Sequence, residues 1–170
     1  KAIKLHEAVT GSKPAGWCLG RCSANTIRIA CEYGKFEYIS DSYADDLPYW
    51  YNNGSQNNLI IPYTLDVNDM RFATNQGFNS GTQFYDYLKD TFDLLYKEGQ
   101  KGRPKMMTVG LHCRLVGRPG RAQAIKKFID YIQGHEKVWC AKRIDIAKFW
   151  KDRFPPSGKK IIPSEMTKSQ

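Results

Sequence analysis

The spacing of apolar residues predicts helices that alternate with short strands. Two segments repeat apolar residues every three or four positions, as the buried face of an α-helix does. The first follows Ser80 or Thr82 and ends at Gly99, and the second ends at Gly134. Their apolar positions are Phe84, Leu88, Phe92 and Leu95 in the first, and Ala124, Ile125, Phe128, Ile129 and Ile132 in the second.

Shorter segments complete the alternation. Helices are predicted over residues 3–9, 25–33 and 144–151, with Gly11, Gly34 and Pro155-Pro156 as their stops. Short apolar or alternating runs predict strands at residues 16–19, 36–39, 59–62, 106–111 and 138–140, of which 106–111 is the strongest. Repeated strand–helix units indicate a parallel sheet or an α/β barrel.

Composition fits one globular domain or a large part of one. Hydrophobic residues make up 41% of the 170 residues, enough for a packed core, and no run of 18 apolar residues predicts a membrane span. The first seven residues lack Met and a secretory signal, and they have the pattern of an amphipathic helix. We therefore expect the chain to be a fragment or a processed product, with residues 157–170 as a loose tail.

Charge is unevenly distributed along the chain. Residues 1–100 hold 9 basic and 12 acidic residues, whereas residues 101–170 hold 17 basic and 5 acidic residues. A basic half can indicate a nucleic-acid partner, but no RRM, KH or zinc-finger pattern occurs. A solvated face with a basic tail is the favoured interpretation, and we expect no nucleic-acid and no membrane partner.

The five cysteines do not form a zinc set. Cys18 and Cys22 are spaced only loosely for a metal, and no second Cys/His pair completes the ligands. We predict reduced, buried, structural thiols and a cytoplasmic protein.

Four polar clusters follow predicted strands, at residues 20–23, 41–46, 66–71 and 112–114. In α/β folds the reacting groups lie on loops after the carboxyl ends of strands, so all four clusters could meet at one site.

His112 is the most informative residue of these clusters. An imidazole at a strand end can donate a proton to a leaving nitrogen near neutral pH. The alternative is a half-buried structural histidine, which suits His6 and His135 on their predicted helices. His112 differs because an apolar strand precedes it and a Gly/Pro loop follows it.

The carboxylates and guanidinium groups of the clusters have both functional and structural interpretations. Asp41, Asp45 or an adjacent aspartate could orient a base, hold a water or accept from substrate, or could simply stabilise a turn. Asp69 and Arg71 could form a salt bridge, and Arg21 could neutralise an aspartate or hold a carbonyl oxygen. No dinucleotide fingerprint, P-loop, Gly-x-Ser-x-Gly or His-Glu-x-x-His motif occurs.

Four stretches carry a resemblance to a known family, at residues 20–26, 40–50, 61–72 and 110–121. On these stretches the chain resembles the polysaccharide-deacetylase (NodB-like) superfamily, and more closely its allantoinase-like members. The resemblance covers residues 1–154, nearly the whole chain. It implies that residues 1–156 are the C-terminal part of an α/β domain, a distorted seven-stranded (β/α) barrel.

The resemblance also implies roles for particular residues. Arg21 matches the family's third motif, residues 41–50 match the fourth, and Leu111-His112 matches the fifth only in part. In the family that histidine is the general acid. The first two motifs, an aspartate pair and a His-x-x-x-His metal site, do not occur here, so the isolated chain is expected to need the N-terminal half of its domain.

The function that follows is hydrolysis of a carbon–nitrogen bond, most specifically the cyclic amide of allantoin. We predict His112, Asp45 and Arg21 as catalytic residues. The predicted substrate-binding residues are Asp41, Asn68, Asp69, Arg71, Arg118 and Trp50. A small ureide is the expected partner, in a homo-oligomer with no cofactor and no metal.

Two alternatives remain open at the level of sequence. Polysaccharide deacetylation would use aromatic platforms, which Tyr43, Tyr49, Trp50 and Tyr51 could supply. A non-catalytic structural subunit of the same fold is the other.

Overall fold

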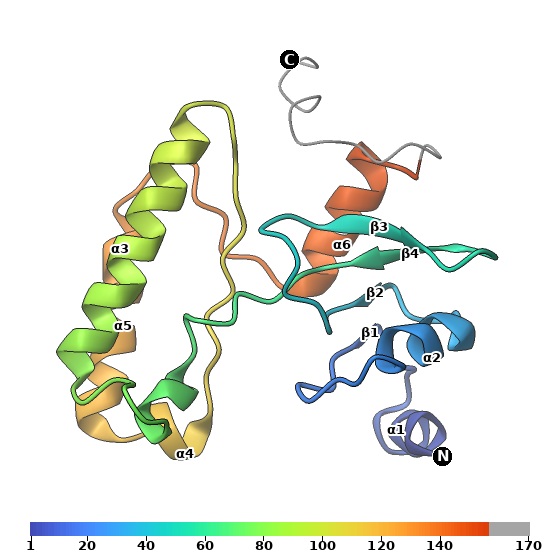
Figure 1. The fold of residues 1–170 in the computed structure, drawn as a ribbon, viewed down its shortest axis with the longest axis horizontal. Coiled ribbons are helices and arrows are strands. Elements are labelled where there is room, and N and C mark those ends of the chain that lie inside the picture. Colours follow the sequence, from blue (N-terminus) through green and yellow to red (C-terminus); the bar gives the residue numbers. More distant parts are fainter. Residues whose placement is uncertain (157–170) are drawn as a thin grey trace. The chain divides into compact units, whose positions relative to one another are not determined.

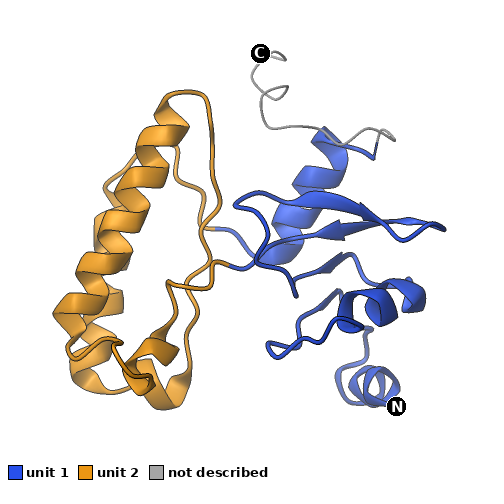
Figure 2. Ribbon diagram, viewed as in Figure 1, with its two compact units in different colours: residues 1–63, 141–162 blue, residues 64–140, 163–170 orange. Residues whose placement is uncertain are grey.

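The computed structural model describes residues 1–156, which form helices and short strands along the chain (Figure 1). The chain divides into two compact units (Figure 2). The first contains residues 1–63 and 141–156, and the second contains residues 64–140. The sheet belongs to the first unit, and the longest helices belong to the second.

The sheet of the first unit is mixed. Its strands lie in the order β1 (Gly16–Trp17), β2 (Tyr38–Ile39), β4 (Asn57–Ile60) and β3 (Tyr49–Asn52). The first three strands are parallel, with Trp17 opposite Ile39 and Ile39 opposite Ile60. The pair β3 and β4 is antiparallel. The prediction of an α/β fold with parallel strands is therefore confirmed in part, since the sheet of the described residues is open and one of its strand pairs is antiparallel.

The antiparallel pair is a hairpin that the spacing of apolar residues did not reveal. Asn53 accepts hydrogen bonds from the backbone N–H groups of Ser55 and Gln56, and Gly54 has φ 92°. Asn-Gly is a strong turn signal because both residues tolerate positive φ. That dipeptide was the local signal for the hairpin.

Three helices belong to the first unit, namely α1 (Ala2–Thr10), α2 (Thr26–Tyr33) and α6 (Arg143–Arg153). The helix predicted over residues 25–33 is confirmed, including its stop at Gly34, whose φ of 67° suits glycine. The buried core of this unit consists of Ala30, Cys31, Ile39 and Ile60.

The second unit is built on two long helices, α3 (Gly81–Gln100) and α5 (Pro119–Gln133), with a short turn of helix, α4 (Cys113–Val116), and a 3₁₀-helix, η1 (Asp69–Ala73). Ser80 caps α3 by accepting from the N–H of Gln83, as predicted. Its core contains Val67, Phe78, Phe84, Leu88, Ala124 and Phe128. The predicted apolar faces are confirmed, except that Ile129 is 44% exposed.

A polar network also joins the two long helices. Asp93 accepts from Lys89 (2.7 Å) and from the hydroxyl of Tyr131 (2.7 Å). These bonds hold the pKa of Asp93 below its usual value, although burial alone would raise it. His135 stands among the rings of Phe92, Tyr96 and Tyr131, as a structural histidine would.

The strands predicted at residues 106–111 and 138–140 are wrong. The first segment is extended but makes one isolated parallel bridge, between Gly110 and Asn68. Trp139 and Cys140 are exposed. A strand needs a neighbouring backbone, and within residues 1–156 neither segment has a continuous ladder partner.

The prediction of buried thiols is also wrong in part. Cys31 is buried, but Cys18, Cys22, Cys113 and Cys140 are exposed, and all five are free thiols. Within residues 1–156, none of the helices has both the length and the apolar character needed to cross a bilayer. The predicted loose tail at 157–170 lies outside the described residues.

Candidate functional site

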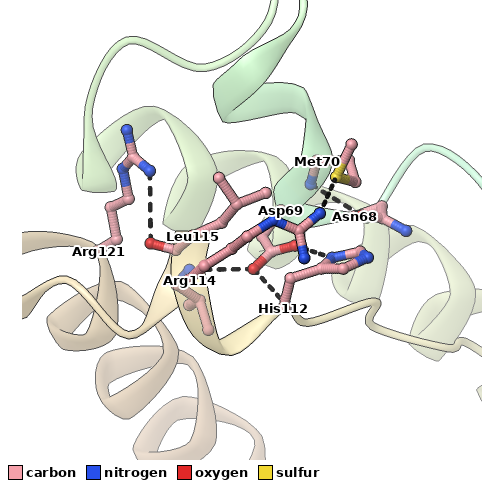
Figure 3. Close-up of polar contacts among 8 residues, drawn as sticks. Asn68, Asp69, Met70, His112, Arg114, Leu115 and Arg121 are labelled. Carbon is pink, nitrogen blue, oxygen red and sulfur yellow. Dashed lines mark hydrogen bonds and ion pairs between the residues drawn. The ribbon is translucent and has the colours of Figure 1, made fainter.

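The second unit brings together His112 and Asp69, which are 43 residues apart in sequence (Figure 3). The carboxylate of Asp69 lies 2.6 Å from Nδ1 of His112 through Oδ1. Its other oxygen accepts from the backbone N–H groups of His112 (2.7 Å) and Val116 (3.1 Å). Asp69 is fully buried, whereas the His112 side chain is 33% exposed.

Local backbone structure explains how the pair forms. Asn68 caps η1 by accepting from the N–H of Met70, which places Asp69 at the first position of that helix. The backbone of Asp69 donates to Gly110 (2.9 Å), so the segment before His112 is aligned with the segment before η1. His112 is the N-cap residue of α4, but its side chain accepts no hydrogen bond from the N–H groups of that helix. The carboxylate of Asp69 accepts from the N–H of Val116 instead.

The hydrogen-bond pattern fixes the proton on the imidazole. A carboxylate has only acceptor positions, so Nδ1 of His112 must be the donor to Asp69. Nε2 is then the nitrogen left for a ligand, and it belongs to a partly exposed side chain. A buried carboxylate that orients an imidazole through one nitrogen prepares the other for proton transfer.

The remaining site residues of this unit have different settings. Asn68 is half-buried, and its side-chain oxygen is the cap of η1. Arg71 does not pair with Asp69, because its guanidinium lies between the rings of Phe78 (4.6 Å) and Tyr87 (4.7 Å). Arg118 is exposed at the N-cap of α5.

Asp41 is the corresponding buried carboxylate of the first unit. It is 4% exposed and accepts from the backbone N–H groups of Leu19 (2.8 Å) and Gly20 (3.2 Å). Its oxygens thus hold the loop that follows β1. Burial and then the Asp41 charge raise the pKa of the Cys18 thiol.

The other predicted residues of the first unit are less enclosed. Arg21 is exposed, and none of residues 1–156 forms a side-chain hydrogen bond with it. Asp45 is exposed and accepts from the N–H groups of Asp46 and Leu47, as a turn aspartate does. Trp50 is half-buried, and its indole N–H donates to the carbonyl of Phe154 (2.6 Å). Their functional roles stay predictions.

Arg143 is a residue of the first unit that sequence reasoning missed. Its guanidinium donates to the hydroxyl of Ser40 (2.5 Å) and to the carbonyl of Ile61 (3.4 Å), and lies over the ring of Tyr63. Both acceptors lie at the carboxyl ends of strands. The signal was its position after the apolar residues 138–140, the same position that drew attention to His112.

Comparison with known proteins places this arrangement in a family. No family model matches the chain. A protein of Schizosaccharomyces pombe assigned to the polysaccharide deacetylases is 44% identical over 160 residues, which cover 86% of this chain and 50% of that protein. The crystal structure of a protein from Pseudomonas aeruginosa PAO1 with the same assignment is 53% identical, with a TM-score of 0.87 over 91% of this chain and 52% of that one.

The chain belongs to the polysaccharide deacetylase family. It is also similar to the PuuE allantoinase, whose crystal structure is 52% identical with a TM-score of 0.87 over 91% of this chain and 51% of that one. A Mycobacterium smegmatis structure is 23% identical (TM-score 0.75) and supports the fold alone. The chain spans about half the length of the proteins that it matches.

The resemblance to deacetylases raises the question of whether the chain holds a metal ion. Within residues 1–156, no group of three or more His, Cys, Asp and Glu side chains is arranged to hold a metal ion. The residues present do not fit such a site, and the chemistry derived below passes through the side chains alone.

Proposed function

We propose that this chain contributes to an amide hydrolase that opens the cyclic amide of allantoin. The observation that carries the proposal is the buried Asp69 carboxylate bonded to Nδ1 of His112, which leaves Nε2 as the proton-donating atom. Similarity to the PuuE allantoinase supports the substrate, and similarity to deacetylases supports the reaction class.

Hydrolysis of a cyclic amide needs three things from a protein. A water must be activated, the oxyanion of the tetrahedral intermediate must be stabilised, and the departing nitrogen must receive a proton. We assign the third task to His112, because a neutral ring-opened nitrogen is a far better leaving group than its anion. Asp69 keeps the ring orientation and stabilises the imidazolium before the proton is given.

The polar residues around the pair suit a ureide. A ureide presents alternating N–H and C=O groups, which amide and guanidinium side chains match. Asn68 and Arg118 are the proposed partners from this unit, with Arg71 as a positively charged neighbour held by aromatic rings. Asp41 and Trp50 are also proposed substrate contacts, and Arg21 and Asp45 are proposed for the carbonyl oxygen and the water.

Polysaccharide deacetylation is the second candidate, because two relatives are assigned to it. An acetylated sugar would be expected to stack on exposed aromatic rings. Of the four aromatic candidates, Trp50 donates to Phe154 and Tyr49 bonds to Ser42 (2.8 Å). Tyr43 (46%) and Tyr51 (40%) are the exposed ones. Two of the four candidates are thus hydrogen-bonded within the protein, and the similarity to the PuuE allantoinase favours the ureide.

The test is turnover by the natural, full-length protein with allantoin and with acetylated chitooligosaccharide as competing substrates. His112→Ala should lower kcat and kcat/KM together by about 10²–10⁴-fold, because the proton is transferred in the transition state. His6→Ala is the matched control, since His6 is exposed on α1. Retained allantoin turnover in folded His112→Ala would remove the catalytic role, and activity only on the sugar would change the substrate.

A further inference from the structure

Arg114 is held in a fixed position beside the His112–Asp69 pair. It is the second residue of α4, two positions after His112. The turn that carries it is fastened at both ends, since Asp69 accepts from the N–H groups of His112 and Val116. A side chain that leaves such a turn starts from a defined place relative to the imidazole.

The guanidinium of Arg114 has little to bind within the protein. Among residues 1–156 it donates to the sulfur of Met70 at 3.8 Å, and a thioether is a weak acceptor (Figure 3). Arg114 is exposed, and no carboxylate within residues 1–156 forms an ion pair with it. Asp69, the carboxylate of this site, is fully buried and already accepts from His112 and Val116. The donors of Arg114 are therefore available to a ligand.

Two neighbouring arginines show the contrast. The guanidinium of Arg71 lies between two aromatic rings, and that of Arg121 lies 4.4 Å from the ring of Phe72 and donates to the carbonyl of Leu115 (3.4 Å). Both serve packing of the second unit. Arg114 lies on the turn between them in sequence but has neither a ring nor a carbonyl partner among the described residues.

We propose that Arg114 binds the carboxylate that ring opening creates. This inference rests on the proposed function. The ligand class is a ureide that bears a carboxylate. An arginine fork matches the two oxygens of a carboxylate with parallel hydrogen bonds, which a lysine cannot reproduce.

The reaction balances as follows. The water oxygen bonds to the ring carbonyl carbon while the water passes one proton to Nε2 of His112, and the carbonyl oxygen becomes the oxyanion. The ring C–N bond then breaks, its electron pair goes to nitrogen, and Nε2 of His112 gives that nitrogen a proton. The carboxylic acid that results ionises to a carboxylate, releasing its proton to solvent, and Arg114 is the cation that faces it.

The experiment measures binding of allantoate to the natural, full-length protein by calorimetry, beside allantoin turnover. Arg114→Met should weaken allantoate binding by about 10–100-fold, the range for a lost charged hydrogen bond. Arg114→Lys should recover part of this loss because it keeps the charge without the fork. Arg103→Met, which removes an exposed arginine in the loop after α3, should leave binding unchanged. Circular dichroism confirms that each variant is folded.

The outcomes distinguish the role of Arg114 from the proposed hydrolysis of allantoin. Equal allantoate affinity in wild type and Arg114→Met, or no allantoate binding to the wild type, would overturn the role of Arg114 even if allantoin is hydrolysed. Arg114-dependent binding of allantoate without any allantoin turnover would support the anion site and overturn the proposed reaction.

Discussion

Asp41 in the first unit and Asp69 in the second are held by the same kind of hydrogen bonds, but they bind different side chains. Each is a buried carboxylate, and each accepts hydrogen bonds from two backbone N–H groups. Asp41 binds the backbone of Leu19 and Gly20 and the thiol of Cys18, whereas Asp69 binds an imidazole that is partly exposed. A buried aspartate is therefore a structural anchor by default, and the side chain bonded to it decides whether it can take part in chemistry.

Asp69→Asn should have the largest effect of the changes to the two aspartates. An amide nitrogen would face N–H donors, so at least one of the three hydrogen bonds is lost in a buried site. We expect a loss of about 1–3 kcal/mol in the free energy of unfolding. We also expect kcat to fall by about 10–100-fold, as when the partner that orients an imidazole is removed.

Chemical denaturation and steady-state kinetics of the natural protein measure these two losses separately. A folded Asp69→Asn protein with wild-type kcat would show that the pair is structural, and the contrast with Asp41 would disappear.

Asp41→Asn should affect stability more than turnover. The carboxylate holds the loop after β1, so we expect the free energy of unfolding to fall by about 1–3 kcal/mol. Its oxygens are nearly all engaged, and kcat should change by less than about tenfold, below the 10–100-fold range for Asp69→Asn. A kcat loss as large as that of Asp69→Asn would contradict this assignment and give Asp41 a role in the chemical step beyond its proposed substrate contact.

The same variant has an independent readout in Cys18. Burial raises the pKa of this thiol first, and the Asp41 charge raises it further. Removing the charge should lower the pKa and increase the thiolate fraction at mildly alkaline pH. Alkylation of the Cys18 peptide, followed by mass spectrometry, should therefore be faster in Asp41→Asn. An unchanged rate would show that the charge does not act on the thiol.

Asp93→Asn should have the smallest effect, and it serves as a reference because Asp93 takes no part in the hydrogen bonds of Asp41 or Asp69. The pKa of Asp93 is lowered, so its contribution to stability is present above its unfolded pKa and is lost as pH falls through the folded one. The difference in Tm between wild type and variant should be clear at neutral pH and should shrink below about pH 4. Activity should not change. A difference that is constant from pH 7 to pH 3 would contradict this origin.

Local signals explain why the helices were predictable. The periodicity of α3 and α5, the Ser80 cap and the Gly34 and Gly134 stops all lie within a few residues of the elements that they define. The strand predicted at residues 106–111 was wrong because a strand depends on a partner outside its own segment. Its composition suits a strand, but a strand exists only beside a partner, and the described residues give it a single bridge.

The sequence predicted both residues of the pair but not that they would bond to each other. His112 and Asp69 both followed apolar segments and were both selected, but the sequence offered Arg71 as a nearer partner for Asp69. The aromatic rings of Phe78 and Tyr87 hold Arg71 instead. Arg114 lay in the polar cluster at residues 112–114 but was not predicted as a site residue, because an arginine there has no local pattern that distinguishes it from other surface cations.

The most direct test of the central claim is the tautomer of His112, measured by ¹H–¹⁵N NMR of the imidazole nitrogens in the natural protein. In the neutral state, the proton should reside on Nδ1, bonded to Asp69, with Nε2 unprotonated. In Asp69→Asn this preference should be lost. A neutral His112 with its proton on Nε2 in the wild type would contradict the orientation on which the proposed general acid depends.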